Sequence, residues 1–412
     1  MTYGCIGEHL KHSFSKEIHN LIADYDYSIK EIPKNEVDSF MKAADFTAIN
    51  VTIPYKETVI PYLDFIDDSA KLIGAVNTIV KKDGKLYGYN TDFFGMSMLA
   101  NYANISFLGK KVLILGTGGT SKTAYAVAKA EGAAEVIKVS RNKNDDSVLY
   151  SEVYEKNADA QIIINTTPVG MFPEIFNVPI DIDRFPNLVG VIDAIYNPLS
   201  TPLVLHAKKK NIPAIGGLFM LVAQAVRASE IFLDTKYPEH LINDIYKKIE
   251  KEKKNIVLIG MPASGKTTVG RILSQNLSRK LIDSDEEIEL SESRSIPKIF
   301  EDDGESRFRD IESDIIKKIS AIGSAVIATG GGVVLREENI NALKENGKVY
   351  FIDRPLDMLI PTFDRPTASS KDAITKRYNE RYDVYRSAAD TIIDANCSKE
   401  EVAQAILNDF LS

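Results

Sequence analysis

One short segment of the chain has the residue types and the spacing of a phosphate-binding loop. It reads Gly-Met-Pro-Ala-Ser-Gly-Lys-Thr over residues 260–267 and directly follows the apolar run 255–259. In such a loop, glycines let backbone N–H groups converge on phosphate oxygens, the lysine reaches the β- and γ-phosphates, and the threonine hydroxyl binds Mg²⁺. Because an apolar strand precedes the loop, the segment predicts a site for ATP and Mg²⁺ rather than a glycine-rich turn without a ligand. The residues assigned to the nucleotide are Gly260, Ser264, Gly265, Lys266 and Thr267, and Thr267 is also assigned to the metal.

A second glycine-containing turn, Gly116-Thr-Gly118-Gly119, lies between an apolar segment and an alanine-rich one. Its glycines permit close approach of the backbone to a pyrophosphate, whose charge the N-terminus of the following helix stabilises. The next predicted strand is followed by Arg141, at a place where an NAD-preferring site usually has an acidic side chain. An arginine there favours the 2′-phosphate of NADP, although a solvated basic turn is the simpler alternative. The sequence thus predicts NADP(H) binding at these four residues.

The elements that must position these loops alternate along the chain. Apolar strand segments at 135–140, 161–166 and 189–196 are separated by helical patterns, one of them at 203–210. This alternation predicts an α/β fold with parallel sheets. The predicted domains are an α/β substrate lobe at 1–100, completed by helices within 218–248, a Rossmann-like lobe at 101–217 and a P-loop domain at 255–412, with the charged segment 247–255 as a linker.

Composition narrows the class of protein. The 412 residues carry a net charge of −8 without a basic stretch interleaved with aromatics, so we expect small-molecule substrates and neither nucleic acid nor a membrane surface as partner. Cys5 and Cys397 are too far apart in sequence to suggest a disulfide framework or a zinc site. No signal peptide or membrane-spanning run is apparent, so we expect the cytoplasm. His12 and His19 are interpreted as structural, and a homodimer is compatible with the sequence.

Polar clusters lie at the ends of predicted strands in the first half of the chain. They are His12-Ser13-Phe-Ser15, Asn50-Val-Thr52-Ile-Pro-Tyr-Lys56, Gly74-Ala-Val-Asn77-Thr78 and Asn90-Thr91-Asp92-Phe-Phe-Gly95, together with the loop 165–171 and the helical segment 217–225. These motifs closely resemble those of shikimate dehydrogenase, and the resemblance spans about residues 1–248. It implies the NADPH-dependent reduction of 3-dehydroshikimate to shikimate.

That resemblance assigns the chemistry to specific residues. Reduction of a ketone needs a hydride donor on one face and a proton donor near the carbonyl oxygen. The family's catalytic pair falls on Lys56, which donates the proton, and Asp92, which orients it. Since alternate side chains of an extended segment share a face, we expect Thr52 and Lys56 to point to one side. By the same periodicity, Ser13 and Ser15 share a face. The implied substrate residues are Ser13, Ser15, Thr52, Asn77 and Gln224, and Met220 is assigned to the cofactor.

The second half contains a further set of chemical side chains. Asp283 and Asp285 lie two residues apart on a predicted strand, so we expect both carboxylates on one face, one for Mg²⁺ and one for an acceptor hydroxyl. Arg309 and Arg381, in charged helical segments, have the fork geometry that binds a carboxylate. The glycines 330–332 follow a buried strand and permit a ligand to approach the backbone.

Together with Asp364-Arg365-Pro366, these motifs resemble shikimate kinase over about residues 254–412. The resemblance implies phosphorylation of shikimate at its 3-hydroxyl by MgATP. Its catalytic residues fall on Lys266, Asp285 and Arg365, the last in a closing lid, and Asp283 assists Mg²⁺ through water. The implied shikimate residues are Asp285, Arg309, Gly331, Gly332 and Arg381. Ser398 and Glu401 have the spacing of a capping box at the start of the last helix.

The product implied for the first half is the substrate implied for the second, so the sequence predicts a bifunctional enzyme of aromatic amino-acid biosynthesis. Two alternatives remain open. The P-loop domain could sense nucleotide without transferring phosphate, or the first half could be a catabolic quinate or shikimate dehydrogenase that uses NAD. Asp285, Arg309 and Arg381 speak against the first alternative, and Arg141 speaks against the second.

Overall fold

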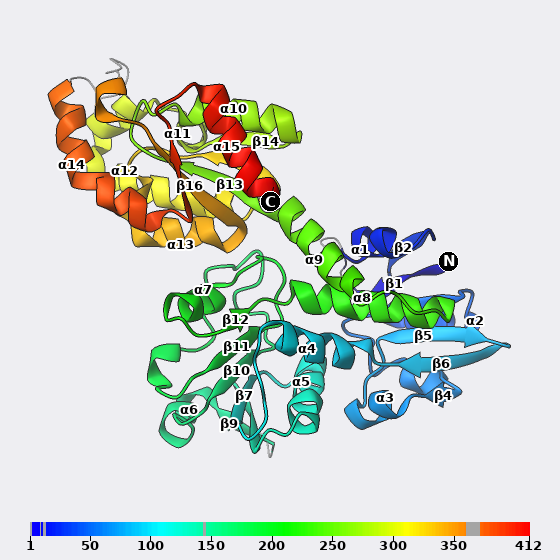
Figure 1. Ribbon diagram of the computed structural model, residues 1–412. Helices are drawn as coiled ribbons and strands as arrows, with labels where there is room; N and C mark the ends of the chain where they lie inside the picture. The colour runs from blue at the N-terminus through cyan, green and yellow to red at the C-terminus, as the bar shows by residue number, and fades with distance from the viewer. Residues whose placement is uncertain (1, 9, 11–13, 143–145, 360–370) are drawn as a thin grey trace. The chain divides into compact units, whose positions relative to one another are not determined.

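A computed structural model describes residues 2–8, 10, 14–142, 146–359 and 371–412 of the chain (Figure 1). It divides into two compact units, the first made of Met1–Asn197 and Thr201–Ile249, and the second of Pro198–Ser200 and Glu250–Ser412. Within the described ranges, no helix is long and apolar enough to cross a membrane.

The first unit begins with a mixed sheet in the strand order β2-β1-β3-β5-β6-β4. Its strands are β1 (Tyr3–Gly7), β2 (Tyr27–Glu31), β3 (Ala48–Val51), β4 (Phe65–Ile66), β5 (Thr78–Lys82) and β6 (Lys85–Tyr89). Strand β5 runs antiparallel to both β3 and β6, and the other neighbours are parallel. The helices of this lobe are α1 (Ser15–Ile22), α2 (Val37–Ala43), α3 (Asp68–Ile73) and α4 (Thr91–Tyr102).

The second sheet of this unit is parallel throughout, as the alternation of strands and helices predicted, in the order β12-β11-β10-β7-β8-β9. Its strands are β7 (Lys111–Leu115), β8 (Glu135–Ser140), β9 (Ser147–Leu149), β10 (Ile162–Asn165), β11 (Gly190–Asp193) and β12 (Ala214–Ile215). The connecting helices are α5 (Gly119–Ala130), α6 (Tyr150–Lys156) and α7 (Pro202–Lys209). The predicted strand at 135–140 has these same bounds in the structure.

Helix α8 (Leu218–Leu233) returns the chain to the first sheet, where it packs against α1 and α4. Its residues Ala228 and Phe232 join a buried cluster with Cys5, Tyr27 and Val80. Helix α9 (His240–Lys253) follows, so the segment interpreted as a linker is helical as far as Lys253. The helix persists there because it buries Ile249 and carries a Glu250–Lys254 ion pair of 3.0 Å at the favourable spacing.

The second unit contains a parallel sheet in the order β14-β15-β13-β16-β17. Its strands are β13 (Asn255–Ile259), β14 (Lys280–Asp283), β15 (Ala325–Ala328), β16 (Gly347–Asp353) and β17 (Thr391–Asp394). Its helices are α10 (Lys266–Leu277), α11 (Ser284–Glu292), α12 (Ile296–Ser320), α13 (Glu337–Asn346), α14 (Lys371–Ala388) and α15 (Lys399–Leu411). Short 3₁₀ turns in the chain are Lys34–Glu36, Ile60–Tyr62, Ile182–Arg184, Val333–Leu335 and Leu356–Met358.

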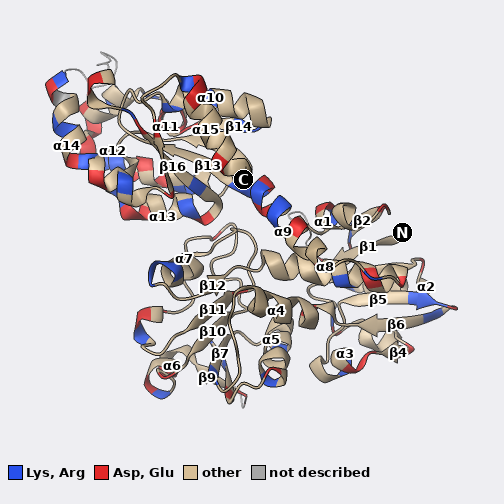
Figure 2. Cartoon of the chain, viewed as in Figure 1, with Lys and Arg blue, Asp and Glu red and all other residues tan. Residues whose placement is uncertain are grey.

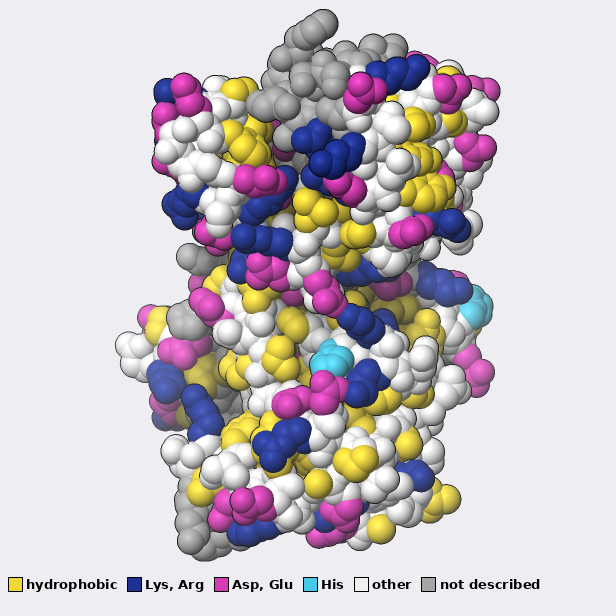
Figure 3. Space-filling model, turned by 90° about the vertical axis from the view of Figure 1, so that its left-hand side faces the viewer, with side chains coloured by type: hydrophobic (Ala, Val, Ile, Leu, Met, Phe, Trp, Pro, Cys, Tyr) yellow, Lys and Arg dark blue, Asp and Glu magenta, His cyan; other side chains and the backbone are white. Residues whose placement is uncertain are grey.

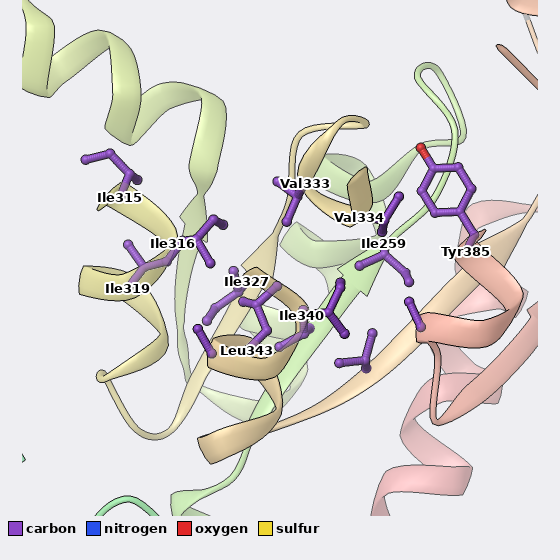
Figure 4. Packing of buried hydrophobic residues seen from close by; sticks show 14 of the residues in the cluster. Ile259, Ile315, Ile316, Ile319, Ile327, Val333, Val334, Ile340, Leu343 and Tyr385 are labelled. Atoms are coloured by element: carbon purple, nitrogen blue, oxygen red, sulfur yellow. The ribbon is translucent and has the colours of Figure 1, made fainter. Parts of the chain in front are cut away.

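Strand β13 separates two apolar cores in this unit because successive side chains of a strand point to opposite faces. Ile256 and Leu258 join the cluster that includes residues of α10 and α15. Val257 and Ile259 join the larger cluster with α12, α13 and α14, part of which is drawn in Figure 4. Figure 2 shows the complementary pattern, since α12, α13 and α14 carry acidic and basic residues side by side whereas β13 carries none. The surface drawn in Figure 3 likewise intersperses both signs of charge.

His19 is a buried structural residue of the first unit, as the sequence suggested, whereas His12 lies outside the described residues. Its ring stacks on Tyr27 with centroids 3.8 Å apart, and Nδ1 lies 2.5 Å from Tyr25 Oη. Burial lowers the pKa of His19 to about 3. The folded state therefore disfavours protonated His19.

Acid is expected to destabilise the first unit through His19. A folded pKa below the unfolded value of about 6.5 gives a stabilising contribution that is complete above pH 6.5 and is lost as pH falls towards 3. At pH 5 the expected loss is about 2 kcal/mol. His19→Phe keeps a ring against Tyr27 but cannot be protonated, so urea unfolding followed by circular dichroism should show a smaller loss between pH 7 and pH 5 in this variant. An equal loss in both proteins would contradict the assignment.

Candidate active sites

A lysine and an aspartate from separate elements meet in the first unit. Lys56 lies in the turn after β3, and Asp92 lies in the first turn of α4, which Asn90 caps by accepting a 3.2 Å hydrogen bond from Phe93 N. Lys56 Nζ lies 2.5 Å from Asp92 Oδ2, and the two side chains are only 16% and 10% exposed. A surface ion pair would be largely solvated, whereas both side chains of this pair are mostly buried.

The expectation that residues 52–56 form an extended segment is wrong. Strand β3 ends at Val51, and Tyr55 N donates to Thr52 O at 2.9 Å, which closes a turn. The turn forms because Pro54 has no N–H to donate to a strand ladder. Thr52 and Lys56 nevertheless line the same cavity. The turn therefore places both side chains on one side, as was expected of an extended segment.

Asn77 fastens the start of β5 to the start of α4. Its Oδ1 accepts from Thr91 N at 2.7 Å, and its Nδ2 donates to Thr91 Oγ1 at 3.0 Å. Next to it, Asn50 Nδ2 donates to Thr78 Oγ1 at 3.1 Å, and Asn50 Oδ1 accepts from Tyr27 Oη at 2.7 Å. Asn77 is 2% exposed, so part of its role is to hold the residue before Asp92 in place.

These residues surround a cavity of about 150 Å³ inside the first unit. Its lining includes most of the residues proposed from sequence for the substrate, the proton transfer and the nicotinamide, namely Ser15, Thr52, Lys56, Asn77, Asp92, Met220 and Gln224. Ser15 is the first residue of α1, after the N-cap Phe14, rather than part of an extended segment. Ser13 lies outside the described residues.

Other residues of this cavity were not proposed from the sequence. They are Cys5, Asn50, Val51, Thr120, Ala194, Tyr196, Gly217 and Leu221. Tyr196 follows β11, and its position just after a strand end was the one signal that could have indicated it. Gly217 is required because a Cβ there would lie 2.2 Å from Ala194 O, so only glycine lets the start of α8 approach this loop.

The turn proposed for the cofactor lies at the carboxyl end of β7. Gly116 has a φ of +106°, and a Cβ on it would lie 3.0 Å from Thr166 Oγ1. Gly118 precedes α5 as its N-cap, and the space beside Gly118 and Gly119 is open. Arg141 is exposed at the turn after β8. An open helix N-terminus with a cation after the neighbouring strand β8 fits a nucleotide with a charged 2′-position. Thr120, at the start of α5, lines the cavity described above.

The phosphate loop of the second unit connects β13 to α10. Gly260 and Gly265 have φ values of +152° and +95°. Lys266 is buried, and its ammonium donates to the carbonyls of Gly260 and Met261 at 2.9 Å each. Ser264 Oγ is buried and has no hydrogen-bond partner among the described residues, which suits a ligand that enters the loop. The loop lies between a strand and a helix as the sequence predicted, and its binding of phosphates stays a prediction.

Ala263 of this loop adopts a left-handed conformation, with a φ of +66°. A non-glycine residue in this region costs about 1–2 kcal/mol, more than the extra entropy that glycine loses on folding. Ala263→Gly is therefore expected to stabilise the second unit by about 0.5–1 kcal/mol in urea unfolding. Ala342→Gly, within α13, serves as the control and should destabilise the unit by about 1 kcal/mol. A loss of stability in Ala263→Gly would contradict the strain at this position.

The expectation that Asp283 and Asp285 share one face of a strand is also wrong. Strand β14 ends at Asp283, which caps α11 by accepting a 3.0 Å hydrogen bond from Asp285 N. The helix starts here because aspartate is a favoured N-cap residue. Asp283 Oδ2 also accepts from Thr267 Oγ1 at 2.7 Å. Both aspartates still line one cavity, so the proposed metal and acceptor residues remain together.

This cavity of about 430 Å³ includes Arg309, Arg381, Gly331 and Gly332, as the sequence proposed. The glycines leave room for the site's own side chains as well as for a ligand. A Cβ on Gly332 would lie 2.0 Å from Arg309 Nη1, and one on Gly331 would lie 2.9 Å from Pro262. Arg381 donates to Gly331 O at 3.1 Å. Arg365 lies outside the described residues.

Glu312 is the main residue of this cavity that the sequence did not indicate. It is 1% exposed, and its Oε2 accepts from Arg309 Nη1 at 2.7 Å. Burial raises the pKa of Glu312, and Arg309 opposes that shift. Glu312 follows Arg309 by three residues on α12, and this spacing, which lets an acidic and a basic side chain pair on a helix, was the signal available in the sequence. Glu312 holds the guanidinium in a fixed orientation towards the cavity.

A divalent cation has few protein contacts in this site. Among the described residues, no cluster of three or more His, Cys, Asp and Glu side chains could hold a metal ion. The Thr267 hydroxyl and the Asp283 carboxylate, which are in contact, are the donors available beside the phosphate loop. This limited set fits Mg²⁺, which keeps several waters and takes its remaining ligands from nucleotide phosphates.

Comparisons with known proteins agree with both halves of the chain. A family model described as "Shikimate dehydrogenase substrate binding domain" matches residues 5–79, and one described as "Shikimate kinase" matches residues 262–411. A curated protein of Clostridium beijerinckii, "Shikimate dehydrogenase (NADP(+))", is 38% identical over 269 residues, which cover 61% of this chain and 99% of that protein.

Solved structures of shikimate dehydrogenases match about 60% of the chain. Shikimate dehydrogenase 1 from Peptoclostridium difficile is 37% identical with a TM-score of 0.56, over 60% of this chain and 98% of that chain. Shikimate 5-dehydrogenase from Thermus thermophilus, solved in complex with NADP(H) and shikimate, is 25% identical with a TM-score of 0.54, over 60% of this chain and 99% of that chain.

Proposed function

We infer the function of both units from the premise that this chain belongs to the shikimate dehydrogenase family and carries a shikimate kinase domain at residues 262–411. Both are enzyme domains of the shikimate pathway, which leads to the aromatic amino acids. We propose that the first unit reduces 3-dehydroshikimate to shikimate with NADPH, and that the second transfers phosphate from MgATP to the 3-hydroxyl of shikimate. Since both reactions consume NADPH or ATP, we place the protein in the cytoplasm.

The observation that carries the reductase proposal is the Lys56–Asp92 pair inside the cavity of the first unit. NADPH, when bound, supplies the hydride. Lys56 donates a proton to the carbonyl oxygen, and Asp92 holds the ammonium so that its proton points at that atom. Ser15, Thr52 and Gln224 offer hydroxyl and amide groups to the hydroxyls of the substrate. Thr120 places the cofactor turn beside the same cavity.

Selectivity for NADPH over NADH is supported by Arg141 and by the NADP(+) in the name of the Clostridium beijerinckii relative. The guanidinium can form two hydrogen bonds with a 2′-phosphate, whereas NADH offers it only a hydroxyl. The proposal is tested by comparing kcat/KM for the two cofactors. A higher value with NADH would favour the alternative of a catabolic quinate or shikimate dehydrogenase.

The kinase proposal depends on a phosphate loop that opens beside a cavity with two arginines. Mg²⁺, when bound, neutralises charge on the transferred phosphate. Lys266 balances the charge that spreads over the γ-phosphate, and Thr267 with Asp283 faces the metal. Asp285 accepts a hydrogen bond from the acceptor hydroxyl, and Arg309 with Arg381 binds the substrate carboxylate. Arg365, which lies outside the described residues, is proposed from the resemblance as a further catalytic cation.

One experiment on the intact chain separates a kinase from a nucleotide sensor. The protein is supplied with 3-dehydroshikimate, NADPH and MgATP, and loss of NADPH absorbance is followed together with ADP release and with shikimate 3-phosphate by mass spectrometry. We expect both signals and the phosphorylated product. Reduction without ADP release, also when shikimate is added directly, would leave only the sensor alternative.

Gly332→Ala tests the carboxylate clamp. The backbone there, with φ −101° and ψ −8°, accepts alanine, but the new Cβ would lie 2.0 Å from Arg309 Nη1 and would displace the guanidinium. We expect the KM for shikimate to rise about tenfold or more, the effect of weakening a hydrogen bond to a charged group. The KM for ATP, measured in the same initial-rate series, should change by less than about twofold. An unchanged KM for shikimate would remove Arg309 from the substrate site.

A further inference from the structure

Lys399 lies against the phosphate loop although it is far from the loop in sequence. A Cβ placed on Gly265 would lie 3.2 Å from Lys399 Cε, 3.7 Å from Cδ and 3.8 Å from Cγ. The aliphatic stem therefore runs along Gly265, whose φ of +95° also requires glycine. Lys399 is the first residue of α15, and its side chain is half-buried. The ammonium is thereby held near the loop rather than extended into solvent.

The charge of Lys399 is unfavourably placed without an anion. Lys399 is the first residue of α15, and its side chain lies beside Gly265, which is the N-cap of α10. The ammonium therefore lies near the positive N-terminal ends of two helix dipoles. Several other lysines of this unit form ion pairs, for example Lys344 with Asp390 at 3.0 Å. Lys399 forms no ion pair with any of the residues that the structure describes. The first turn of α15 has acidic residues, but Glu401 is engaged with Ser398 in the capping box that the sequence predicted.

The position of Lys399 relative to the acceptor cavity indicates which part of a ligand it would bind. That cavity is lined by Pro262 and Thr267 of the loop, and its lining includes neither Gly265 nor Lys399. The γ-phosphate of the nucleotide must face the acceptor hydroxyl for in-line transfer. The part of the nucleotide on the Gly265 side is then the α- and β-phosphates.

We propose that Lys399 is a second cationic ligand of the nucleotide, which binds the α- and β-phosphates of a nucleoside di- or triphosphate from the side of the loop away from the acceptor cavity. The proposal rests on the kinase function proposed above. Lys266 contacts the transferred γ-phosphate from within the loop, and Lys399 binds the α- and β-phosphates, which remain in the nucleotide product. Loss of Lys399 should therefore weaken nucleotide binding while it changes the transfer step little.

The test is calorimetric titration of the intact protein with MgADP at low salt. Lys399→Met keeps the stem along Gly265 but removes the charge, and we expect its Kd for MgADP to rise roughly tenfold, as for loss of a charge-assisted hydrogen bond. Lys399→Arg, which restores a cation, should return Kd to within about threefold of the wild type. Lys317→Met, in the last turn of α12, is the matched control and should leave the Kd for MgADP unchanged. The KM for shikimate and the dehydrogenase rate should be unchanged in all variants.

Inorganic pyrophosphate, titrated with Mg²⁺, separates a phosphate contact from a contact with the base. Under the proposal, Lys399→Met weakens pyrophosphate and MgADP to a similar degree, whereas weakening of MgADP alone would overturn it. Equal MgADP affinity in the wild type and Lys399→Met would also overturn it, with the kinase function intact. If the wild type itself binds no MgADP, the kinase function fails first.

Lys399→Glu separates binding from folding. A glutamate at the first position of α15 interacts favourably with the helix dipole, so the unfolding midpoint should be equal to or above that of the wild type while MgADP binding is lost. A fall of both together would show a structural role and would contradict the proposal.

Discussion

Lys56→Ala is expected to lower kcat of the dehydrogenase by about 10²–10⁴-fold, the usual contribution of a positioned general acid. Lys56 Nζ lies 2.5 Å from Asp92 Oδ2, so the pair delivers a proton from a defined position in the cavity, where both side chains are mostly buried. Because alanine removes the proton donor rather than a substrate contact, kcat should fall more than KM rises. The measurement is the initial rate of NADPH oxidation with saturating 3-dehydroshikimate.

The kinase activity of the same variant is the internal control for this prediction. It should stay within about twofold of the wild type, since the substitution lies in the other unit. Lys42→Ala, which removes an exposed lysine paired with Asp38 at 2.8 Å, provides a matched control and should leave both activities unchanged. Equal loss of both activities in Lys56→Ala would indicate general damage, and a dehydrogenase rate near the wild type would remove Lys56 from the chemistry.

Lys266→Ala is expected to reverse this pattern, with a loss of kinase activity of about 10³-fold or more. Lys266 is the buried cation of the loop. During transfer, negative charge is distributed over the oxygens of the phosphoryl group, and the Lys266 ammonium balances this charge. The measurement is ADP release with saturating shikimate and MgATP, read against NADPH oxidation in the same sample. Dehydrogenase activity should be retained.

Stability must be followed in this variant because Lys266 also donates to two backbone carbonyls. Alanine removes the lysine bond to Gly260 O, which costs about 1–3 kcal/mol where water cannot replace the lysine. Met261 O keeps its hydrogen bond from Ser264 N at 3.1 Å. Lys266→Arg keeps a donor and separates the two effects, since it should restore stability without restoring much transfer. Lys318→Ala is the exposed control. Substantial kinase activity in folded Lys266→Ala would contradict the assignment of the phosphate loop.

The sequence determined those features that depend on a few neighbouring residues. The phosphate loop at 260–267, the turn at 116–119, the parallel order of the second sheet and the cap formed by Ser398 and Glu401 are all present as predicted. Glycines that adopt positive φ, apolar runs of strand length and capping side chains act within one turn or one strand. Such signals can be read without knowing what packs against them.

The predictions that relied on strand periodicity were wrong at two places, because each strand ends before the polar residues that were assigned to it. Thr52 and Lys56 lie in a turn, and Asp283 and Asp285 lie on either side of a helix start. In both places a local hydrogen bond, to Thr52 O or to Asp283 Oδ1, replaced the ladder that would have continued the strand. The side chains still converge because the turn and the helix bring them to the same cavity.

Only the tertiary structure decided which distant residues complete each site. Tyr196 lines the first cavity from the loop after β11, and Lys399 covers Gly265 from the last helix. The same is true of Gly332, whose missing side chain makes room for a guanidinium of α12. These contacts join residues that no local pattern links. These contacts form because the helices and strands pack closely and leave little space for each side chain. The shape of that space depends on the packing of the whole unit.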